Sequence, residues 1–563
     1  MSRRLGYAVG FVSICVAFAC TGSSEGDPAG ADAGSGASTG AGTGGASGGT
    51  GGASSGVGGA SGGTSAGGAS GGSAGSAGSA GAAGSAGGPN TNCANADGYE
   101  ITVLSTTAIA DMGTPFDPDE EDDVNPFDWN TNYGKPPEII ALPNGENVDI
   151  LWQDSEQGKA FVVHVTKQET SYEITQAYEV PIIDRIMGFA RDEEGNYYYA
   201  TGIDEDDTIT LNDPPEGVHR SDIVRVVKFA PGGGCALLNI DVDLARETAE
   251  ADSEAIINPM VAASSRLAYS GGQLALVHGI NTPSDGSVRH QKALTTHLDG
   301  TTGAVTRTDS MWVSHSFDQR LFWDGSGFVE THLGDAYPRA IAFARFTADD
   351  GTDTYELFRP KGAEGANSTY TRLGGVAPIA TGDYGYLVVF TTDRNDTIPG
   401  GDWSTLAPTR DLAFVRVRRN FDTIDPDDGG FIDESGAVLS VMSSGQAVDN
   451  HLTWLTDYAG DQAQADRSRV VAIDADQFVV LWERWNGNDG NSSEYDGTYA
   501  LVMNGAGTVT GAATKVGDHH ISRGDDAVAV GGRALFVTGN APGKQLLLNF
   551  VASDLTTETV TLP

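Results

Sequence analysis

The segment "MGFARDEEGNYYYATG" (residues 187–202) contains two apolar runs joined by a short turn sequence, "DEEG". After a polar loop come "DIVRVVKFAPGGG" (222–234) and "CALLNIDV" (235–242), again two apolar runs around a glycine-rich turn. Short runs of β-branched and aromatic residues that are bounded by Gly, Asn and Asp are typical of antiparallel strands. Residues 187–242 therefore predict four strands, with tight turns after the first and the third.

The pattern of strand, tight turn and strand recurs along the chain. The further copies are "EIIALPNGENVDILWQD" (138–154), "SRLAYSGGQLALVHG" (265–279), "QRLFWDGSGFVETHLG" (319–334), "GVAPIATGDYGYLVVFTT" (375–392), "SRVVAIDADQFVVLWER" (468–484) and "DAVAVGGRALFVTGN" (526–540). Together with the first copy they make seven units. Recurring four-stranded antiparallel units are the sequence signature of a β-propeller. We therefore predict an all-β chain with a seven-bladed propeller over residues 137–563.

The order of hydrophobic strand, Asp/Asn-Gly turn, hydrophobic strand and loop resembles the NHL/YVTN-like propeller superfamily. Asp-box motifs and regular Trp-Asp dipeptides are absent. The resemblance implies an architecture and almost nothing about activity, because propellers carry many functions. Two ways of closing the ring stay open. "YEITVLS" (99–105) could add an outer strand to the last blade, or that blade could be completed by its own "TETVTLP" (557–563).

The N-terminal quarter of the chain reads as a targeting segment followed by a spacer. Residues 1–20 combine a basic start with a short apolar run and resemble a bacterial lipoprotein signal, which implies lipidation of Cys20. Simple cleavage that exposes Cys20 is the alternative. Residues 21–92 are almost entirely Gly, Ser, Ala and Thr, a composition typical of a disordered tether. Residues 93–136 form a lead-in. We expect a lipid-anchored outer-membrane or secreted protein of the cell envelope.

Charge narrows the set of partners. The chain has 33 Lys and Arg against 76 Asp and Glu, for a net charge of −43. Nucleic acids and anionic lipid surfaces attract basic proteins, so neither is an expected partner, and membrane contact would come only through the lipid anchor. Cys93 and Cys235 remain after processing. In an oxidising compartment they could form a disulfide that pins the end of the tether to the domain, or stay isolated thiols. We expect a monomer.

Loop lengths differ between the two faces of the predicted propeller. The turns after first and third strands are tight, whereas the other connections are long, for example 203–221, 241–264, 393–410 and 427–466. Because binding residues often lie on loops of a rigid scaffold, the long-loop face is predicted to be functional. Randomly tolerated insertions are the alternative.

Polar residues at the ends of first and second strands map to that face. Arg266, Arg320 and Arg469 begin first strands, with Asp525 and Asp526 at the same place in the last unit. An arginine that recurs in a repeat could serve the repeat, by pairing with an Asp of a neighbouring blade. The same residues could instead bind a ligand, and the candidate ligand-binding set is Arg320, Asp335, Arg339, Trp454, Trp482 and Trp485. Aromatic faces beside planar hydrogen-bonding groups suit sugar rings or peptides.

Histidines suggest a catalytic alternative, because imidazole can move protons or bind a metal near neutral pH. The candidate catalytic residues are His315, His332, His451 and Tyr337, and a divalent metal could be held by a subset of His278, His315, His332, His451 and His519. No catalytic motif supports a particular chemistry. The leading hypothesis is a tethered propeller that binds an extracellular glycan or protein through its long-loop face. The alternative is a His/Arg-dependent polysaccharide lyase or hydrolase, with or without a metal.

Overall fold

The computed structural model describes residues 99–105, 112–118, 135–154, 158–202, 223–243, 264–283, 289–311, 316–334, 341–346, 352–358, 371–382, 384–393, 410–418, 453–458, 463–487 and 494–563. Every helix or strand assigned within these ranges is a β-strand, which confirms the all-β class. None of the described residues forms a helix long and apolar enough to cross a membrane.

The first four blades follow one another along the chain, and all strand pairs are antiparallel. Blade 1 contains β2 (Ile139–Asn144), β3 (Asn147–Gln153), β4 (Ala160–Lys167) and β5 (Tyr172–Val180). Blade 2 contains β6 (Arg185–Arg191), β7 (Tyr197–Gly202), β8 (Ile223–Phe229) and β10 (Leu238–Asp243). Blade 3 contains β11 (Arg266–Ser270), β12 (Gln273–Pro283), β13 (Arg289–Asp299) and β14 (Val305–Met311). Blade 4 contains β15 (Ser316–Trp323), β16 (Phe328–Gly334), β17 (Ile341–Phe346) and β18 (Thr352–Phe358).

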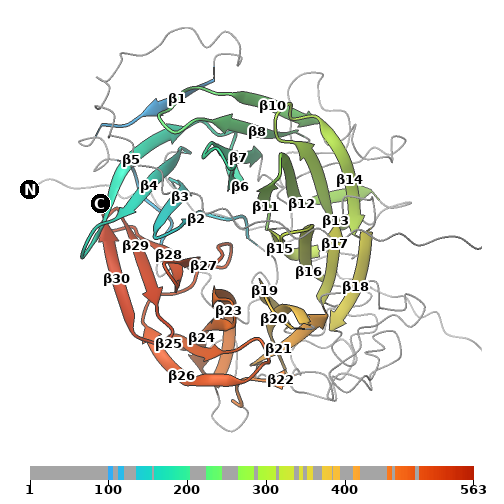
Figure 1. Cartoon of the computed structure of the whole chain (residues 1–563), viewed down its shortest axis with the longest axis vertical. Coiled ribbons are helices and arrows are strands. Elements are labelled where there is room, and N and C mark those ends of the chain that lie inside the picture. Colours follow the sequence, from blue (N-terminus) through green and yellow to red (C-terminus); the bar gives the residue numbers. More distant parts are fainter. Residues whose placement is uncertain are drawn as a thin grey trace, which may run out of the picture. The chain divides into compact units, whose positions relative to one another are not determined.

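Three more blades complete the ring. Blade 5 contains β19 (Arg372–Pro378), β20 (Tyr384–Asp393), β21 (Arg410–Arg418) and β22 (Thr453–Trp454). Blade 6 contains β23 (Ala463–Asp474), β24 (Gln477–Asn486), β25 (Glu494–Met503) and β26 (Val509–Gly517). Blade 7 contains β27 (Val528–Val530), β28 (Arg533–Asn540), β29 (Gln545–Val551) and β30 (Thr557–Leu562). The described residues thus form the predicted seven-bladed β-propeller, with the first strand of each blade near the centre (Figure 1).

Hydrophobic packing lies between the blades, and each of the seven seams has its own buried cluster. Inner and middle strands bury both of their faces, which explains why they are apolar runs and not alternating sequences. Gly188 in β6 shows how closely the blades approach. A Cβ there would lie 2.5 Å from the backbone nitrogen of Leu267 in β11, so only glycine fits.

The ring closes without exchanging a strand between its ends. Blade 7 is completed by its own β30, which is the second of the two predicted alternatives. The other candidate strand, β1 (Glu100–Val103), instead pairs with β5 of blade 1 and with β9 (Gly234–Cys235), between β8 and β10. The seam between blades 7 and 1 is further bridged by the lead-in segment, where Gly539 N donates to Phe116 O at 2.9 Å.

Candidate functional site

In four consecutive blades, 3 to 6, the inner strand carries an arginine that contacts the backbone of its own strand. In each case Nη1 donates to the carbonyl oxygen of the preceding residue, at 2.7 to 3.0 Å. The four arginines are Arg266, Arg320, Arg372 and Arg469. The shared contact shows that part of their role belongs to the repeat, because it fixes the guanidinium against its own strand.

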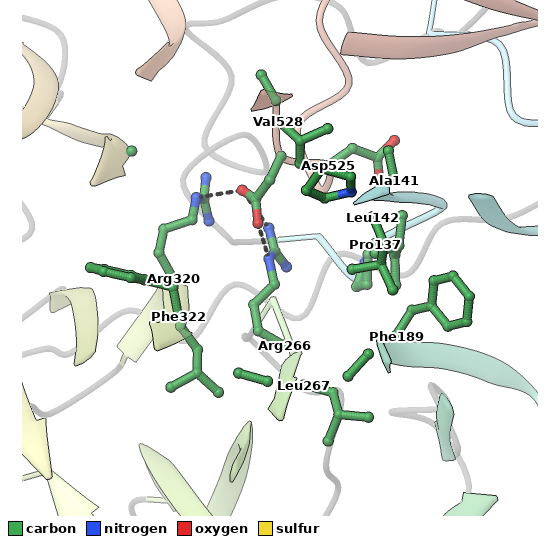
Figure 2. Close-up of a pocket in the computed structure, with 18 of the residues that line it drawn as sticks. Pro137, Ala141, Leu142, Phe189, Arg266, Leu267, Arg320, Phe322, Asp525 and Val528 are labelled. Carbon is green, nitrogen blue, oxygen red and sulfur yellow. Dashed lines mark hydrogen bonds and ion pairs between the residues drawn. The ribbon is translucent and has the colours of Figure 1, made fainter. Parts of the chain in front are cut away.

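Blade 7 provides a carboxylate that pairs with two of these arginines. Asp526 precedes β27 and accepts from Arg266 Nε at 2.5 Å and Nη2 at 3.2 Å. It also lies 3.0 Å from Arg320 Nε. In Figure 2, dashed lines join the guanidinium groups of Arg266 and Arg320 to one carboxylate, which these distances identify as that of Asp526. The pairing crosses the ring from blade 7 to blades 3 and 4, and therefore spans the central channel instead of joining neighbouring blades.

Ion pairing controls the protonation of Asp526. Burial alone would raise the pKa of Asp526, but the charges of Arg266 and Arg320 hold it well below its usual range. Its side chain is 36% exposed, and because it lies deep in the ring, that exposure is to the channel. A ligand in the channel would meet an ionised hydrogen-bond acceptor that already has two cationic partners.

Arg469 lies beside the Arg266–Asp526–Arg320 group, but its guanidinium binds backbone carbonyls instead of a carboxylate. Its guanidinium donates to the carbonyl oxygens of Ser468, Ser522, Arg523 and Asp525, at 2.7 to 3.0 Å. Burial, together with the charges of Arg320 and Arg266, lowers the pKa of Arg469 to about 10. Asp525 is also buried, and its Oδ1 accepts the backbone N–H groups of Glu138 and Ile139 at 2.8 and 3.0 Å. Burial raises the pKa of Asp525 to about 6.

These charged residues form the floor of a cavity of about 410 Å³ that inner strands of all seven blades line. Its walls are mainly apolar, and include Leu142, Phe189, Leu267, Phe322, Val376 and Val528. The exposure of the lining side chains indicates that the cavity opens toward the tight turns. Arg266 in β11 and Arg320 in β15 are buried, whereas Tyr269 and Trp323, near the ends of the same strands, are partly exposed.

Backbone groups add polarity to this cavity. Each inner strand pairs with only one neighbour in its sheet, so its other edge faces the channel. An unpaired strand edge presents alternating N–H and C=O groups. The cavity therefore combines apolar side chains with a ring of backbone donors and acceptors.

The structure places the predicted site residues in three settings. Arg320 lies in the cavity floor, together with Arg266, Arg469, Asp525 and Asp526. Other predicted residues lie in the packed interior or away from the cavity. The remainder lie outside the described residues: Cys20, Cys93, His315, Asp335, Tyr337, Arg339 and His451.

Two predicted metal or catalytic histidines are core residues. His278 and His332 are both fully buried within their sheets. Burial lowers the pKa of His278 to about 4 and that of His332 to about 3, so both are neutral at physiological pH. His332 Nδ1 lies 3.2 Å from Glu330 Oε1. Neither imidazole is accessible to a substrate in this structure.

The predicted tryptophans also pack. Trp482 is fully buried and donates to Tyr458 Oη at 3.0 Å, and Trp485 is 4% exposed and donates to Glu483 at 3.0 Å. Both have structural roles in blade 6, not the ligand-binding role expected for them, because their rings face protein. Trp454 lies in β22, the outer strand of blade 5, which is separated from the inner strand β19 by β20 and β21.

His519 is partly exposed beside blade 6. Among the residues that the structure describes, no three His, Cys, Asp or Glu side chains are grouped as a metal site would require. The metal site stays a prediction for the parts of the chain beyond these ranges.

Sequence reasoning missed one polar group at the mouth of the cavity. Asp149, in the middle of the apolar run "NVDILWQ", is fully buried and contacts Arg191, which lines the cavity. A charged residue inside a buried strand was the available signal, because such a residue needs specific partners.

No family model matches the chain, and no curated protein matches it. Among solved structures it is similar to the GH43 endo-arabinanase from Bacillus licheniformis, with 13% identity, a TM-score of 0.27 and coverage of 57% of this chain and 95% of that one. It is also similar to an exo-1,5-alpha-L-arabinanase from a bovine ruminal metagenomic library, with 11% identity, a TM-score of 0.27 and coverage of 58% of this chain and 95% of that one. A third similar structure is the acylaminoacyl peptidase of Pyrococcus horikoshii, with 8% identity, a TM-score of 0.36 and coverage of 79% of this chain and 54% of that one.

These likenesses are too weak to carry an argument about activity. Sheet topology alone assigns the described residues to the seven-bladed β-propellers, and Arg266, Arg320 and Asp526 form an ion-paired group across their central channel.

Proposed function

We propose that this chain is a glycan-binding module that holds the end of a saccharide in its central cavity. The observation that carries the proposal is the cavity itself, which has a floor of paired charges beneath mainly apolar walls. Asp526 accepts hydrogen bonds there, and the guanidinium groups beside it donate them. A hydroxyl group can do both, so a neutral ligand with several hydroxyls is the best match.

Size and surface support the same choice. Small-molecule sites are commonly about 300–1,000 Å³, and this cavity falls within that range. Phe322 and Trp323, which are partly exposed, supply flat apolar surface of the kind that packs on sugar rings. An entire protein loop needs more room, so the glycan is favoured over the extracellular protein partner.

Binding is favoured over catalysis because the floor residues are already engaged. Asp526 pairs with two arginines, and Asp525 accepts two backbone N–H groups, so neither is poised to exchange a proton with a substrate. A lyase or hydrolase is the alternative and would depend on His315, Tyr337 and His451. It is tested by incubating the chain with the polysaccharide that it binds and measuring new reducing ends or unsaturated products.

The proposal uses the face with the tight turns, since the cavity opens there. That is the opposite face from the one that loop lengths favoured. The long loops lie largely outside the described residues, so the structure does not test a role for them.

The cellular setting belongs to the same proposal. A lipidated Cys20 and the tether of residues 21–92 would hold an NHL/YVTN-like, monomeric propeller at the cell envelope. A Cys93–Cys235 disulfide would fix the end of the tether. Its support is the position of Cys235, which pairs with Glu100 of β1, a few residues after Cys93.

The decisive experiment is a binding screen of the full chain against neutral oligosaccharides, with affinity measured by calorimetry for each hit. Val376→Trp should fill the cavity and weaken binding by about 10-fold or more, because Val376 lines its wall. Val509→Trp is the matched control, since Val509 is 45% exposed on an outer strand. Equal affinity of the two variants, or binding of no saccharide by the wild type, would overturn the proposal.

A further inference from the structure

A second polar site lies at the mouth of the cavity, on the seam between blades 1 and 2. Its centre is the carboxylate of Asp149, which is fully buried. Arg191 Nη1 donates to it at 2.8 Å, His164 Nδ1 at 2.5 Å, Tyr197 Oη at 2.9 Å and Asn144 Nδ2 at 3.3 Å. Four side chains from both blades therefore converge on one carboxylate.

The position of Asp149 departs from the repeat. The third residue of the second strand, counted from the tight turn, is Ala275 in blade 3, Val479 in blade 6 and Leu535 in blade 7, and in each of these blades it faces the next blade, as Asp149 does. An apolar residue is thus sufficient for the architecture there. Burying a carboxylate costs free energy unless it is fully paired, so a departure of this kind points to a role beyond packing.

Arg191 is the part of this group that a ligand can reach. It is the last residue of β6, lines the cavity where that opens, and keeps 26% of its side chain exposed. A guanidinium has five N–H donors in a fixed plane, and only Nη1 is directed at Asp149. Because the buried carboxylate fixes that edge, the other donors are oriented before any ligand arrives, which reduces the entropy lost on binding.

His164 extends the site outward from the cavity. Its side chain is 20% exposed, and its Nδ1 must carry a proton to donate to Asp149. Nε2 on the opposite edge of the ring can then contact a neighbouring polar group. Arg191 and His164 thus form a short row of partly exposed polar groups that starts at the cavity mouth.

We propose that Arg191 binds an acidic group, a carboxylate or a sulfate, on the sugar unit that follows the one held in the cavity. Planar, doubly donating guanidinium groups match both anions. The inference rests on the proposed glycan-binding function and names its ligand class: a saccharide with a neutral end and an acidic unit next to it.

Overall charge limits the class further. The chain carries a net charge of −43, so a polymer with an acid on every unit is repelled at long range. An acidic group flanked by neutral units suffers less repulsion and still reaches Arg191. We therefore expect selectivity for sparsely acidic glycans over dense polyanions.

The test compares matched pairs of oligosaccharides on the full chain. One pair is a uronate-containing oligosaccharide and its methyl ester, and the other is a sulfated oligosaccharide and its desulfated form. Wild type should bind the acidic member of at least one pair about 10-fold or more tightly. The pair that shows the preference distinguishes carboxylate from sulfate.

Variants assign the preference to Arg191. Arg191→Gln should abolish this preference, so that the acidic and neutral members of each pair bind with equal affinity. Lys167→Gln is the matched control. Lys167 is a cation at the end of β4 and pairs with the exposed Glu146 at 3.0 Å, not with Asp149.

The outcomes separate this inference from the function on which it rests. If wild type binds both members of each pair equally, or if Arg191→Gln keeps the preference, the acidic subsite is refuted while the neutral cavity stands. If wild type binds no saccharide at all, both proposals fail. A folded Arg191→Gln variant, verified by its unfolding transition, is required for each comparison.

Discussion

Individual residues in the channel show two carboxylates that are adjacent in sequence and opposite in behaviour. Asp526 faces two guanidinium groups, which lower its pKa, whereas Asp525 is buried among backbone groups, and burial raises its pKa to about 6. The sequence shows only "DD" at 525–526. The difference arises from contacts between residues 260 positions apart, such as Arg266 with Asp526, and a pattern read along one segment does not contain them.

Asp525 gives a prediction with a definite sign. Its folded pKa lies above that of an unfolded Asp, so the folded state binds more protons between about pH 4 and 6, and stability falls as pH rises through that range. Asp525→Asn keeps an oxygen to accept the two N–H groups and removes the buried charge. The variant should be more stable than wild type at pH 7.5, by about 1–3 kcal/mol, and the gain should vanish near pH 4.

Denaturant unfolding of both proteins at the two pH values measures this difference. A variant that is less stable than wild type at pH 7.5 would show that the Asp525 charge is stabilising, contrary to its assignment here.

Replacement of Asp526 by Asn should lower stability, whereas replacement of Asp525 should raise it. Asp526→Asn leaves Arg266 and Arg320 without their shared carboxylate, and breaking such a pair commonly costs about 3–5 kcal/mol. Because the Asp526 side chain is 36% exposed, we expect a smaller loss, about 2 kcal/mol at pH 7. The loss should shrink as pH falls below 4, where an unfolded Asp takes up its proton. A Glu558→Gln control removes an exposed partner of Arg533 and should change stability by less than about 1 kcal/mol.

At the scale of elements, the strand pattern predicted most of the fold. Each quoted unit became the first two strands of a blade, because apolar runs separated by short turns rich in Gly or Asp leave few other options. Strand β1 was harder to place. Its apolar residues fit the outer edge of any blade, and the choice of blades 1 and 2 depends on the position of β9, a two-residue strand with no pattern of its own. Trp482 and Trp485 were misassigned for a related reason, since aromatic residues serve cores and ligands equally well.

The close approach of β6 and β11 yields a prediction at this scale. Gly188→Ala would place a methyl group within 2.5 Å of Leu267 and force the two inner strands apart. We expect a loss of about 1–3 kcal/mol in unfolding free energy, measured by denaturant titration. Gly517→Ala is the control, because the nearest atom to its new Cβ would be 4.0 Å away. Equal stability of the two variants would mean that the inner strands pack less tightly than the structure shows.

For the whole molecule, two buried histidines determine the response to mild acid. His278 and His332 are neutral when folded but take up protons near pH 6.5 when unfolded, so stability must fall as pH drops below 6.5. Between pH 7 and pH 5 the two histidines should together lower the free energy of unfolding by about 4 kcal/mol, and Asp525 should raise it by about 1 kcal/mol. We therefore expect a net loss.

Unfolding free energies at pH 7 and 5 measure that loss, and His278→Gln should reduce it by roughly half. A propeller that is as stable at pH 5 as at pH 7 would show that at least one of these imidazoles is charged in the folded protein.

The central claim concerns the whole ring, which brings one residue from each of several blades to a common cavity. Its most direct test is a crystal structure of the full chain with a bound oligosaccharide from the binding screen. The account predicts a sugar ring packed against Phe322, with a hydroxyl in hydrogen-bond range of Asp526. A saccharide bound elsewhere, with the central cavity unchanged, would contradict it.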